Sequence, residues 1–205
     1  ITDDASRDEM VSHVYDITYG SVVPQTDTLV LVDDSIVRGT TLQKSILSIL
    51  DRLHPKKIII VSSAPQIRYP DCYGIDMSRM YDFVAFRALI AKLKDDNKEH
   101  LLTEIYQYCK RDEDKPAHEV ENHVKKLYDL YTAEEISNKI SEIVKPQQIF
   151  ADVEVIYQSI ENLHEACPNN KGDWYFTGNY PTPGGNKVAN KAFMNYVEGK
   201  NNRAY

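Results

Sequence analysis

Two short aliphatic runs separated by an amphipathic segment constrain the fold of this chain more than any other feature. Residues 29–32 and 58–61 are apolar and rich in β-branched side chains, and polar residues bound both runs. Each run is short enough to be a buried strand. Between them, apolar positions recur at helical spacing over residues 40–53, and Pro55 ends the pattern. This βαβ order predicts an α/β fold with a parallel sheet, in which ligands bind at the carboxyl ends of the strands.

Helical periodicity dominates the chain beyond the second run. Helices are expected in successive segments, at residues 77–93, 98–110, 117–131, 136–144, 152–165 and 188–198. Thr132 and Glu135 form the pattern of a capping box, which marks the start of the fourth of these helices. One further short strand is expected at residues 148–150.

Charge and cysteine content exclude several classes of protein. The chain has 24 Lys and Arg against 31 Asp and Glu, a net charge of −7, which disfavours general electrostatic binding to nucleic acid or to an anionic membrane. No apolar run approaches the ~18 residues of a membrane-spanning helix. Cys72, Cys109 and Cys167 are odd in number and widely spaced, which fits neither a disulfide framework nor a zinc ribbon. We therefore expect a protein of the reducing cytoplasm.

The segment that follows the first predicted strand, residues 33–41, reads DDSIVRGTT and carries the clearest chemistry. Backbone N–H groups at a helix start, together with hydroxyl side chains, can surround a phosphate, and a glycine allows close approach. Asp33 and Asp34 would repel that phosphate, so they should face sugar hydroxyls or a hard cation such as Mg²⁺. An aspartate pair by itself more often caps a helix or solvates a turn, so the whole segment carries the hypothesis.

This segment closely resembles the phosphoribosyl pyrophosphate motif of the type I phosphoribosyltransferases. The order of residues in a P-loop and the G-x-G-x-x-G dinucleotide fingerprint are both absent. The resemblance implies that Asp33 and Asp34 bind the ribose hydroxyls and the metal shell. It assigns the 5-phosphate to the following loop residues, which are Ser35, Arg38, Gly39, Thr40 and Thr41.

Further motifs narrow the resemblance to the amidophosphoribosyltransferase family. Residues 62–70 read SSAPQIRYP, residues 73–77 read YGIDM, and residues 176–180 read FTGNY. The resemblance implies part of a type I phosphoribosyltransferase fold with a parallel sheet, plus a helical insertion and C-terminal helices. It also implies that this chain is the C-terminal part of a longer polypeptide, whose N-terminal glutaminase domain and early transferase strands are missing here.

The resemblance divides the chain into three parts. Residues 1–84 would be the C-terminal half of the phosphoribosyltransferase core, with residues 1–28 as a remnant of the catalytic loop. Residues 85–131 would be a helical insertion, and the highly charged stretch within it, residues 92–126, is expected to form exposed helices. Residues 132–205 would be a C-terminal helical segment and tail.

The implied activity is transfer of glutamine-derived ammonia to phosphoribosyl pyrophosphate, which gives 5-phosphoribosylamine in the first step of de novo purine biosynthesis. No enzymic nucleophile is needed, so we expect no catalytic residue in this chain, only positioning of substrate and of Mg²⁺. This fragment alone should be inactive. The resemblance further implies inhibition by purine nucleotides at the same loop and a homo-oligomer in the full-length enzyme.

An iron–sulfur cluster, which some members of the family carry, is not expected here. Cys72 stands one place from the family position, and residues 172–175 read GDWY where those members have a C-x-x-C pair. A cluster needs four thiolates, and the chain has three cysteines. The six histidines show no ligand spacing, because His118 and His123 are five residues apart, and they are expected at the surface.

Two other functions stay open at this point. A non-catalytic module of the same fold could keep the pocket in order to sense phosphoribosyl compounds or nucleotides. A transferase for orotate or for a purine base would share the first motif, but the block at residues 67–76 resembles the amidotransferases alone.

Overall fold

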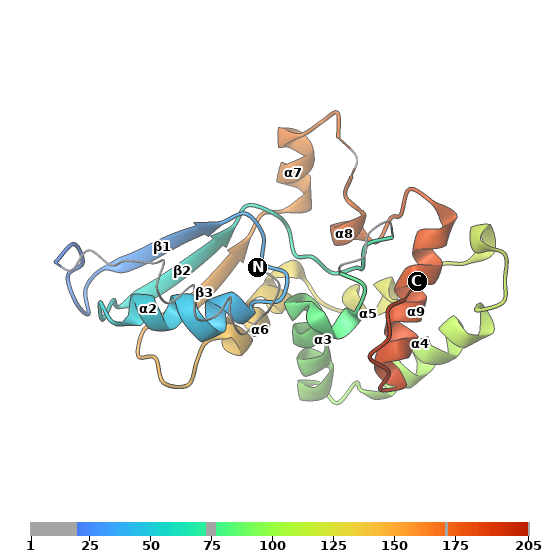
Figure 1. Ribbon diagram of the computed structural model, residues 1–205, viewed down its shortest axis with the longest axis horizontal. Helices are drawn as coiled ribbons and strands as arrows, with labels where there is room; N and C mark the ends of the chain where they lie inside the picture. The colour runs from blue at the N-terminus through green and yellow to red at the C-terminus, as the bar shows by residue number, and fades with distance from the viewer. Residues whose placement is uncertain (1–19, 73–76, 171, 205) are drawn as a thin grey trace.

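The computed structural model describes residues 20–72, 77–170 and 172–204. Most of the expected catalytic-loop remnant, residues 1–19, and the predicted motif residues 73–76 lie outside this part of the chain. Three parallel strands form one sheet in the order β1 (Thr28–Asp33), β2 (Lys57–Ser62) and β3 (Asp152–Tyr157) (Figure 1). The predicted α/β fold with a parallel sheet is therefore confirmed.

The connection between β1 and β2 is helical, as its periodicity predicts. It consists of a π-helical turn η1 (Leu42–Ile46) that continues into α2 (Leu47–Asp51). Leu42 and Leu47 are buried in the core, which explains the apolar spacing of this segment. A π-helical turn inside a helix often accompanies a functional site, and this turn directly follows the segment that carries the aspartates.

The two faces of the sheet differ in burial. Side chains that alternate along the strands, among them Ile58, Ile60 and Val155, are buried in the hydrophobic core. The alternate positions face the other way, and Val30 and Val32 on β1 are 62% and 70% exposed. Within the described residues, this sheet is therefore covered on one face, whereas parallel sheets are usually covered on both.

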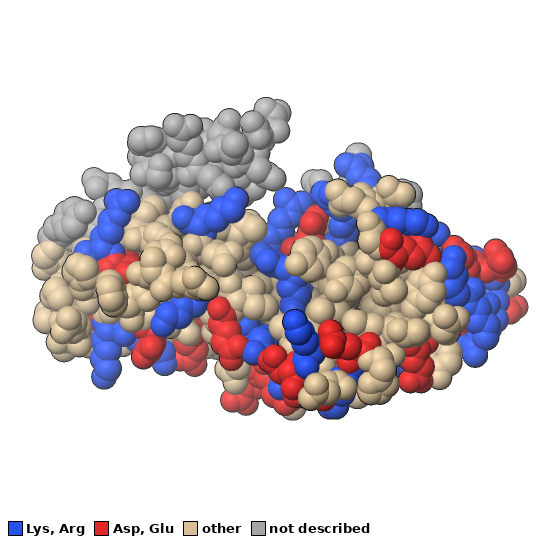
Figure 2. Space-filling model, turned by 90° about the horizontal axis from the view of Figure 1, so that it is seen from below, with Lys and Arg blue, Asp and Glu red and all other residues tan. Residues whose placement is uncertain are grey.

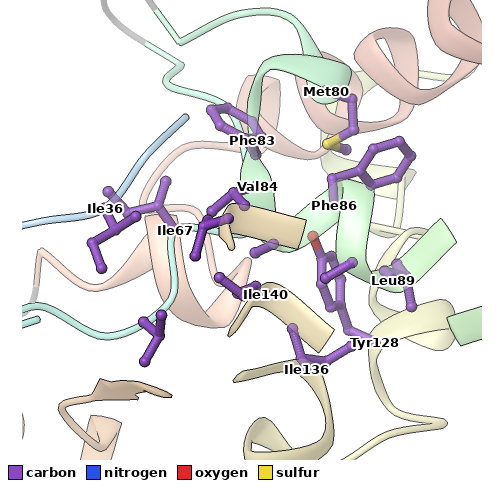
Figure 3. Close-up of a cluster of buried hydrophobic side chains, with 14 of the residues drawn as sticks. Ile36, Ile67, Met80, Phe83, Val84, Phe86, Leu89, Tyr128, Ile136 and Ile140 are labelled. Carbon is purple, nitrogen blue, oxygen red and sulfur yellow. The ribbon is translucent and has the colours of Figure 1, made fainter. Parts of the chain in front are cut away.

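Helices α3 (Val84–Asp95) and α6 (Ala133–Val144) pack against each other, and α6 also packs against β3. The capping box that starts α6 is present: Glu135 N–H donates to Thr132 Oγ1 at 3.1 Å, and Thr132 N–H donates to the Glu135 carboxylate at 2.8 Å. Figure 3 shows how the buried faces of α3 and α6 meet around Val84, Ile136 and Ile140.

A helical layer completes the molecule beyond α3 (Figure 1). Its main pair is α4 (His100–Arg111) and α9 (Pro183–Val197), which contact each other. The shorter helical elements are η2 (Met80–Asp82), η3 (Ala117–Glu119), α5 (Lys125–Tyr128), α7 (Ile160–Ala166) and α8 (Trp174–Thr177).

The expected strand at residues 148–150 and the expected helix over 152–165 are wrong. The third strand is β3, and the helix begins only after it, at Ile160 with Ser159 as its N-cap. Val153, Val155 and Tyr157 alternate with polar or exposed positions, which is the two-residue period of a strand, and β2 supplies the hydrogen-bonding partner.

The expected helix over residues 117–131 is interrupted. Only η3 and α5 are helical there, because side chains of α9 bind the backbone groups in between. Asn186 Nδ2 donates to Val120 O at 2.8 Å, and Asn190 Nδ2 donates to Glu121 O at 2.8 Å. These long-range hydrogen bonds replace the bonds within a continuous helix.

The segment proposed as a helical insertion, residues 85–131, is in part deeply buried, and so are Leu93 and His123 in its expected exposed stretch 92–126. Phe86, Leu89 and Leu93 on α3 are fully inaccessible and belong to the main core. His123 is also buried rather than at the surface, and its Nε2 lies 2.8 Å from Oδ2 of the buried Asp112. The predicted boundary at residue 85 therefore does not coincide with an edge of the core, whereas the division of the chain into domains remains a prediction.

The surface carries charges of both signs. On the face shown in Figure 2, Lys and Arg alternate with Asp and Glu rather than forming one basic surface. Among the helices in the described ranges, none has both the length and the apolar character needed to cross a bilayer.

Candidate functional site

The predicted phosphate loop, residues 33–41, begins at the carboxyl end of β1, and the neighbouring strand fixes its first turn. Ser63 N–H donates to Asp33 O at 2.9 Å, and Ala64 N–H donates to Asp34 O at 3.1 Å. Ser63 Oγ lies 3.2 Å from both of these carbonyl oxygens. The sequence placed Ser63 in the motif at residues 62–70 but did not indicate that it contacts the loop, because its partners lie about 30 positions away and meet it only through pairing of β1 with β2.

The two aspartates each keep one carboxylate oxygen available. Asp34 N–H donates to Asp33 Oδ1 at 2.9 Å, and Ser35 Oγ lies 3.3 Å from Asp34 Oδ1. The other oxygen of each carboxylate, Oδ2, accepts no hydrogen bond from the residues that the structure describes. Two adjacent carboxylate oxygens can thus accept hydrogen bonds from hydroxyl groups or bind a hard cation.

The environment of Asp33 perturbs its acidity. Burial raises the pKa of the Asp33 carboxyl group above its usual value, and the neighbouring Asp34 carboxylate adds to this rise, while the Asp34 N–H opposes it. Tyr157, at the end of β3, is close enough to Asp33 for the aspartate charge to add to the burial that raises the tyrosine pKa. The Tyr157 hydroxyl is buried and has no hydrogen-bonding partner among the described residues.

Beyond the aspartates, the loop presents unused hydrogen-bond donors. The backbone N–H groups of residues 35–41 donate no hydrogen bond to any described residue, and the helix begins at Thr40. Gly39 has a φ of +68°, a left-handed conformation that favours glycine. A run of free N–H groups in a turn at a helix start is an arrangement that binds anions.

The loop rests on the core rather than projecting from it. Ile36 is buried at 4% exposure, and Figure 3 shows it near Ile67 and Val84. Val84 N–H, at the start of α3, donates to Val37 O at 2.8 Å. The guanidinium group of Arg87, one turn further along α3, donates to Arg38 O. These contacts hold the loop backbone in one position.

Among the predicted site residues, the Arg38 side chain has an ion-pair partner in the protein. Its Nη2 lies 3.5 Å from Asp82 Oδ2, and the same carboxylate oxygen lies 3.3 Å from Nε of Arg79. Arg38 is therefore engaged by η2. Asp33, Asp34 and Ser35 contact one another at the carboxyl end of β1, and Gly39, Thr40 and Thr41 follow in the same loop. None of these contacts shows what the residues bind, so the site assignment remains a proposal.

The described ranges contain no group of three or more His, Cys, Asp or Glu side chains arranged to hold a metal ion. The cysteines are free thiols: Cys72 is half-buried, Cys109 is buried and Cys167 is exposed. Burial raises the pKa of the Cys109 thiol to about 12, so it is a poor thiolate ligand. That the protein carries no iron–sulfur cluster remains a prediction.

Comparison with known proteins supports the predicted resemblance. The chain is 48% identical over 58 residues to an amidophosphoribosyltransferase of Pasteurella multocida and 46% identical over 57 residues to that of Escherichia coli; each match covers 28% of this chain and 11% of the relative. It is 28% identical over 158 residues to the amidophosphoribosyltransferase of Saccharomyces cerevisiae, across 75% of this chain and 20% of the relative. No protein-family model matches the chain. The matches thus span a tenth to a fifth of the length of these relatives.

Proposed function

We propose that this chain, which resembles one part of the amidophosphoribosyltransferases, binds the phosphoribosyl group of phosphoribosyl pyrophosphate for transfer of ammonia to its ribose. One observation carries the proposal. Two free carboxylate oxygens, on Asp33 and Asp34, stand beside a turn whose N–H groups at residues 35–41 have no acceptor among the described residues. A phosphorylated sugar offers hydroxyl donors to the first group and a phosphate to the second.

In this proposal the protein acts by positioning. Ammonia released from glutamine attacks C1 of the ribose while pyrophosphate leaves, and the product is 5-phosphoribosylamine, an intermediate of purine biosynthesis. Asp33 and Asp34 hold the ribose hydroxyls, and Thr40 and Thr41 with the N–H groups of the loop hold the 5-phosphate. A sugar fixed at both ends presents C1 in one orientation, which lowers the entropic part of the barrier. In this proposal the glutaminase part and the other transferase strands belong to segments of the polypeptide outside this sequence. The further subunits would be other copies of that polypeptide.

Mg²⁺ is the metal that this set of donors fits. The two Oδ2 atoms are hard oxygen ligands, and a magnesium site commonly uses one or two carboxylates, with phosphate oxygens and waters as the remaining ligands. The ion, when bound, would neutralise charge on the departing pyrophosphate. Purine nucleotides, which also carry a 5-phosphate on a ribose, would compete for the same loop.

The raised pKa of Asp33 gives an expected pH dependence. Because this carboxyl group takes up a proton at a higher pH than an ordinary aspartate, the affinity for phosphoribosyl pyrophosphate with Mg²⁺ should fall as the pH is lowered through that raised pKa. Calorimetric titrations across about pH 3 to 8, a range that includes the ordinary pKa of aspartate, would measure it. In an Asp33→Asn variant the same series reports the titration of the ligand and of all protein groups other than Asp33. Identical slopes in the two proteins would contradict the role of Asp33.

A binding experiment on the loop glycine tests the proposal itself. Gly39 has a positive φ, and an added Cβ would lie 3.0 Å from Val144 Cγ1, so Gly39→Ala should displace the loop and weaken binding of phosphoribosyl pyrophosphate at least about tenfold. Gly20→Ala is the matched control, because Gly20 also has a positive φ but an added Cβ there meets no atom within 4 Å.

Equal affinities of the Gly39 and Gly20 variants, or no binding by the unaltered folded chain, would contradict the proposal. A further measurement separates it from a non-catalytic sensor. If the chain binds both phosphoribosyl pyrophosphate and purine monophosphates but the longer polypeptide forms no phosphoribosylamine, the sensing alternative is the better description.

A further inference from the structure

A cavity beside β3 lies apart from the phosphate loop. Its volume is about 530 Å³, and its walls come from β3, the start of α6, the start of α7 and the segment that follows β2. None of residues 33–41 lines it. In the described sheet β1 and β3 are the two edge strands. The cavity lies beside β3, whereas the phosphate loop follows β1.

One wall of this cavity holds a guanidinium group in a fixed orientation. Arg68 Nε and Nη2 lie 3.1 and 2.7 Å from Oε1 of Gln66, which is itself only 3% exposed. Gln66 Nε2 donates to Ala133 O at 2.7 Å and to Ser137 Oγ at 2.8 Å, which ties it to α6. The Arg68 guanidinium also lies over the Tyr128 ring, 5.2 Å from its centroid. The side chain is therefore held on one edge and one face before any ligand arrives.

The other edge of this guanidinium is unused. Arg68 forms no ion pair with a carboxylate in the described ranges, and its Nη1 donates no hydrogen bond there. An arginine fixed in this way keeps its Nη1 and Nη2 protons available, and such a pair of donors matches the two oxygens of a carboxylate or a phosphate. Orientation before binding lowers the entropy lost when an oxyanion binds.

The remaining walls carry carboxylates rather than further cations. Glu134 and Glu161 line the cavity and form no ion pair with any residue that the structure describes. Glu154, the third acidic residue there, is paired with Lys57. A ligand with several negative charges would meet repulsion from these groups. A ligand with one oxyanion and one protonated amine would match both Arg68 and the free glutamates.

We propose that this cavity is a second ligand site, separate from the phosphate loop, that binds a small molecule with a carboxylate or phosphate group against Arg68. Glu134 and Glu161 favour a molecule that also carries a protonated amine. The site does not depend on the function proposed for the loop.

Two probes that differ only in an amine test this inference. Ethyl phosphate and O-phosphoethanolamine are titrated calorimetrically into the chain, and the second should bind more tightly because of the glutamates. Arg68→Met should weaken binding of both probes at least about tenfold, because it removes a charge-assisted pair of hydrogen bonds. Arg68→Lys, which keeps the charge without the planar donors, should bind with intermediate affinity. Arg52→Met, at an exposed arginine after α2, is the matched control and should bind like the unaltered chain.

The glutamates are tested in a second set of variants. Replacement of Glu134 and Glu161 by glutamine should remove the preference for O-phosphoethanolamine over ethyl phosphate. Equal affinity of the Arg68→Lys variant and the unaltered chain, or no binding of either probe by the folded chain, would overturn the proposal. Binding of phosphoribosyl pyrophosphate should be unchanged in Arg68→Met, so a failure of the loop site and a failure of this cavity give different results.

Discussion

Replacement of both Asp33 and Asp34 by alanine should abolish measurable binding of phosphoribosyl pyrophosphate with Mg²⁺. Each carboxylate offers one oxygen without a partner among the described residues, and a hydrogen bond to a charged group contributes about 1.5–3 kcal/mol. Loss of two such interactions corresponds to a decrease in affinity of at least about 100-fold. Calorimetry of the chain with the ligand and Mg²⁺ measures this change directly.

Two controls isolate the effect of the carboxylates. The Asp33→Asn, Asp34→Asn variant keeps an acceptor for the Asp34 N–H but loses the charge, so it should also bind poorly. Alanine at two exposed aspartates elsewhere, Asp114 and Asp129, changes the net charge by the same amount and should leave binding intact. In the longer polypeptide, the Asp33 and Asp34 substitutions should stop phosphoribosylamine formation while glutamine hydrolysis remains possible. An unchanged transferase rate would refute the assignment of these two residues.

Replacement of Gly178 by alanine should destabilise the fold more than alanine at Gly20 or Gly199, the other glycines outside the loop for which the described residues show a positive φ. Gly178 ends α8 with a φ of +69°, and an added Cβ would lie 2.7 Å from Asn122 Nδ2 and 2.9 Å from Tyr69 Cζ. Asn122 and Tyr69 are both buried, so neither can easily move away. Backbone strain of about 1 kcal/mol and crowding of about 1–3 kcal/mol together predict a loss of about 3 kcal/mol.

Gly199 is the matched control for this substitution. Its φ of +66° is nearly the same, but an added Cβ would meet no atom within 4 Å. Gly199→Ala should therefore lose only the strain, about 1 kcal/mol. The free energies of unfolding of the two variants, measured in urea, separate the two contributions. If both variants lose the same stability, the close packing of Gly178 against Asn122 and Tyr69 does not contribute.

Elements with strong local patterns could be predicted from the sequence, and elements fixed by distant partners could not. The strands at residues 29–32 and 58–61 and the capping box at Thr132 each depend on neighbouring residues, and all are present. The interruption after η3 depends on Asn186 and Asn190, about 66–69 positions further along the chain. No periodicity within the segment itself could have indicated those hydrogen bonds.

The candidate site shows the same division. The sequence of residues 33–41 indicated the hydroxyls, the glycine and the carboxylates, because the motif is continuous. It did not indicate that Ser63 would fix the turn, that Arg87 would bind Arg38 O, or that Asp82 would engage the Arg38 side chain. These contacts arise from the packing of β2, η2 and α3, which brings distant residues to one end of the sheet.

The burial of Ile36 determines how the loop should respond to a ligand. The loop backbone is held against the core at Ile36 and Val37, so it has few conformations to lose when a ligand binds. Binding of the ligand should therefore order the loop little further, and ordering of the loop should contribute little to the heat-capacity change of binding. The association rate should then depend on diffusion and orientation of the incoming sugar phosphate rather than on slow rearrangement of the chain.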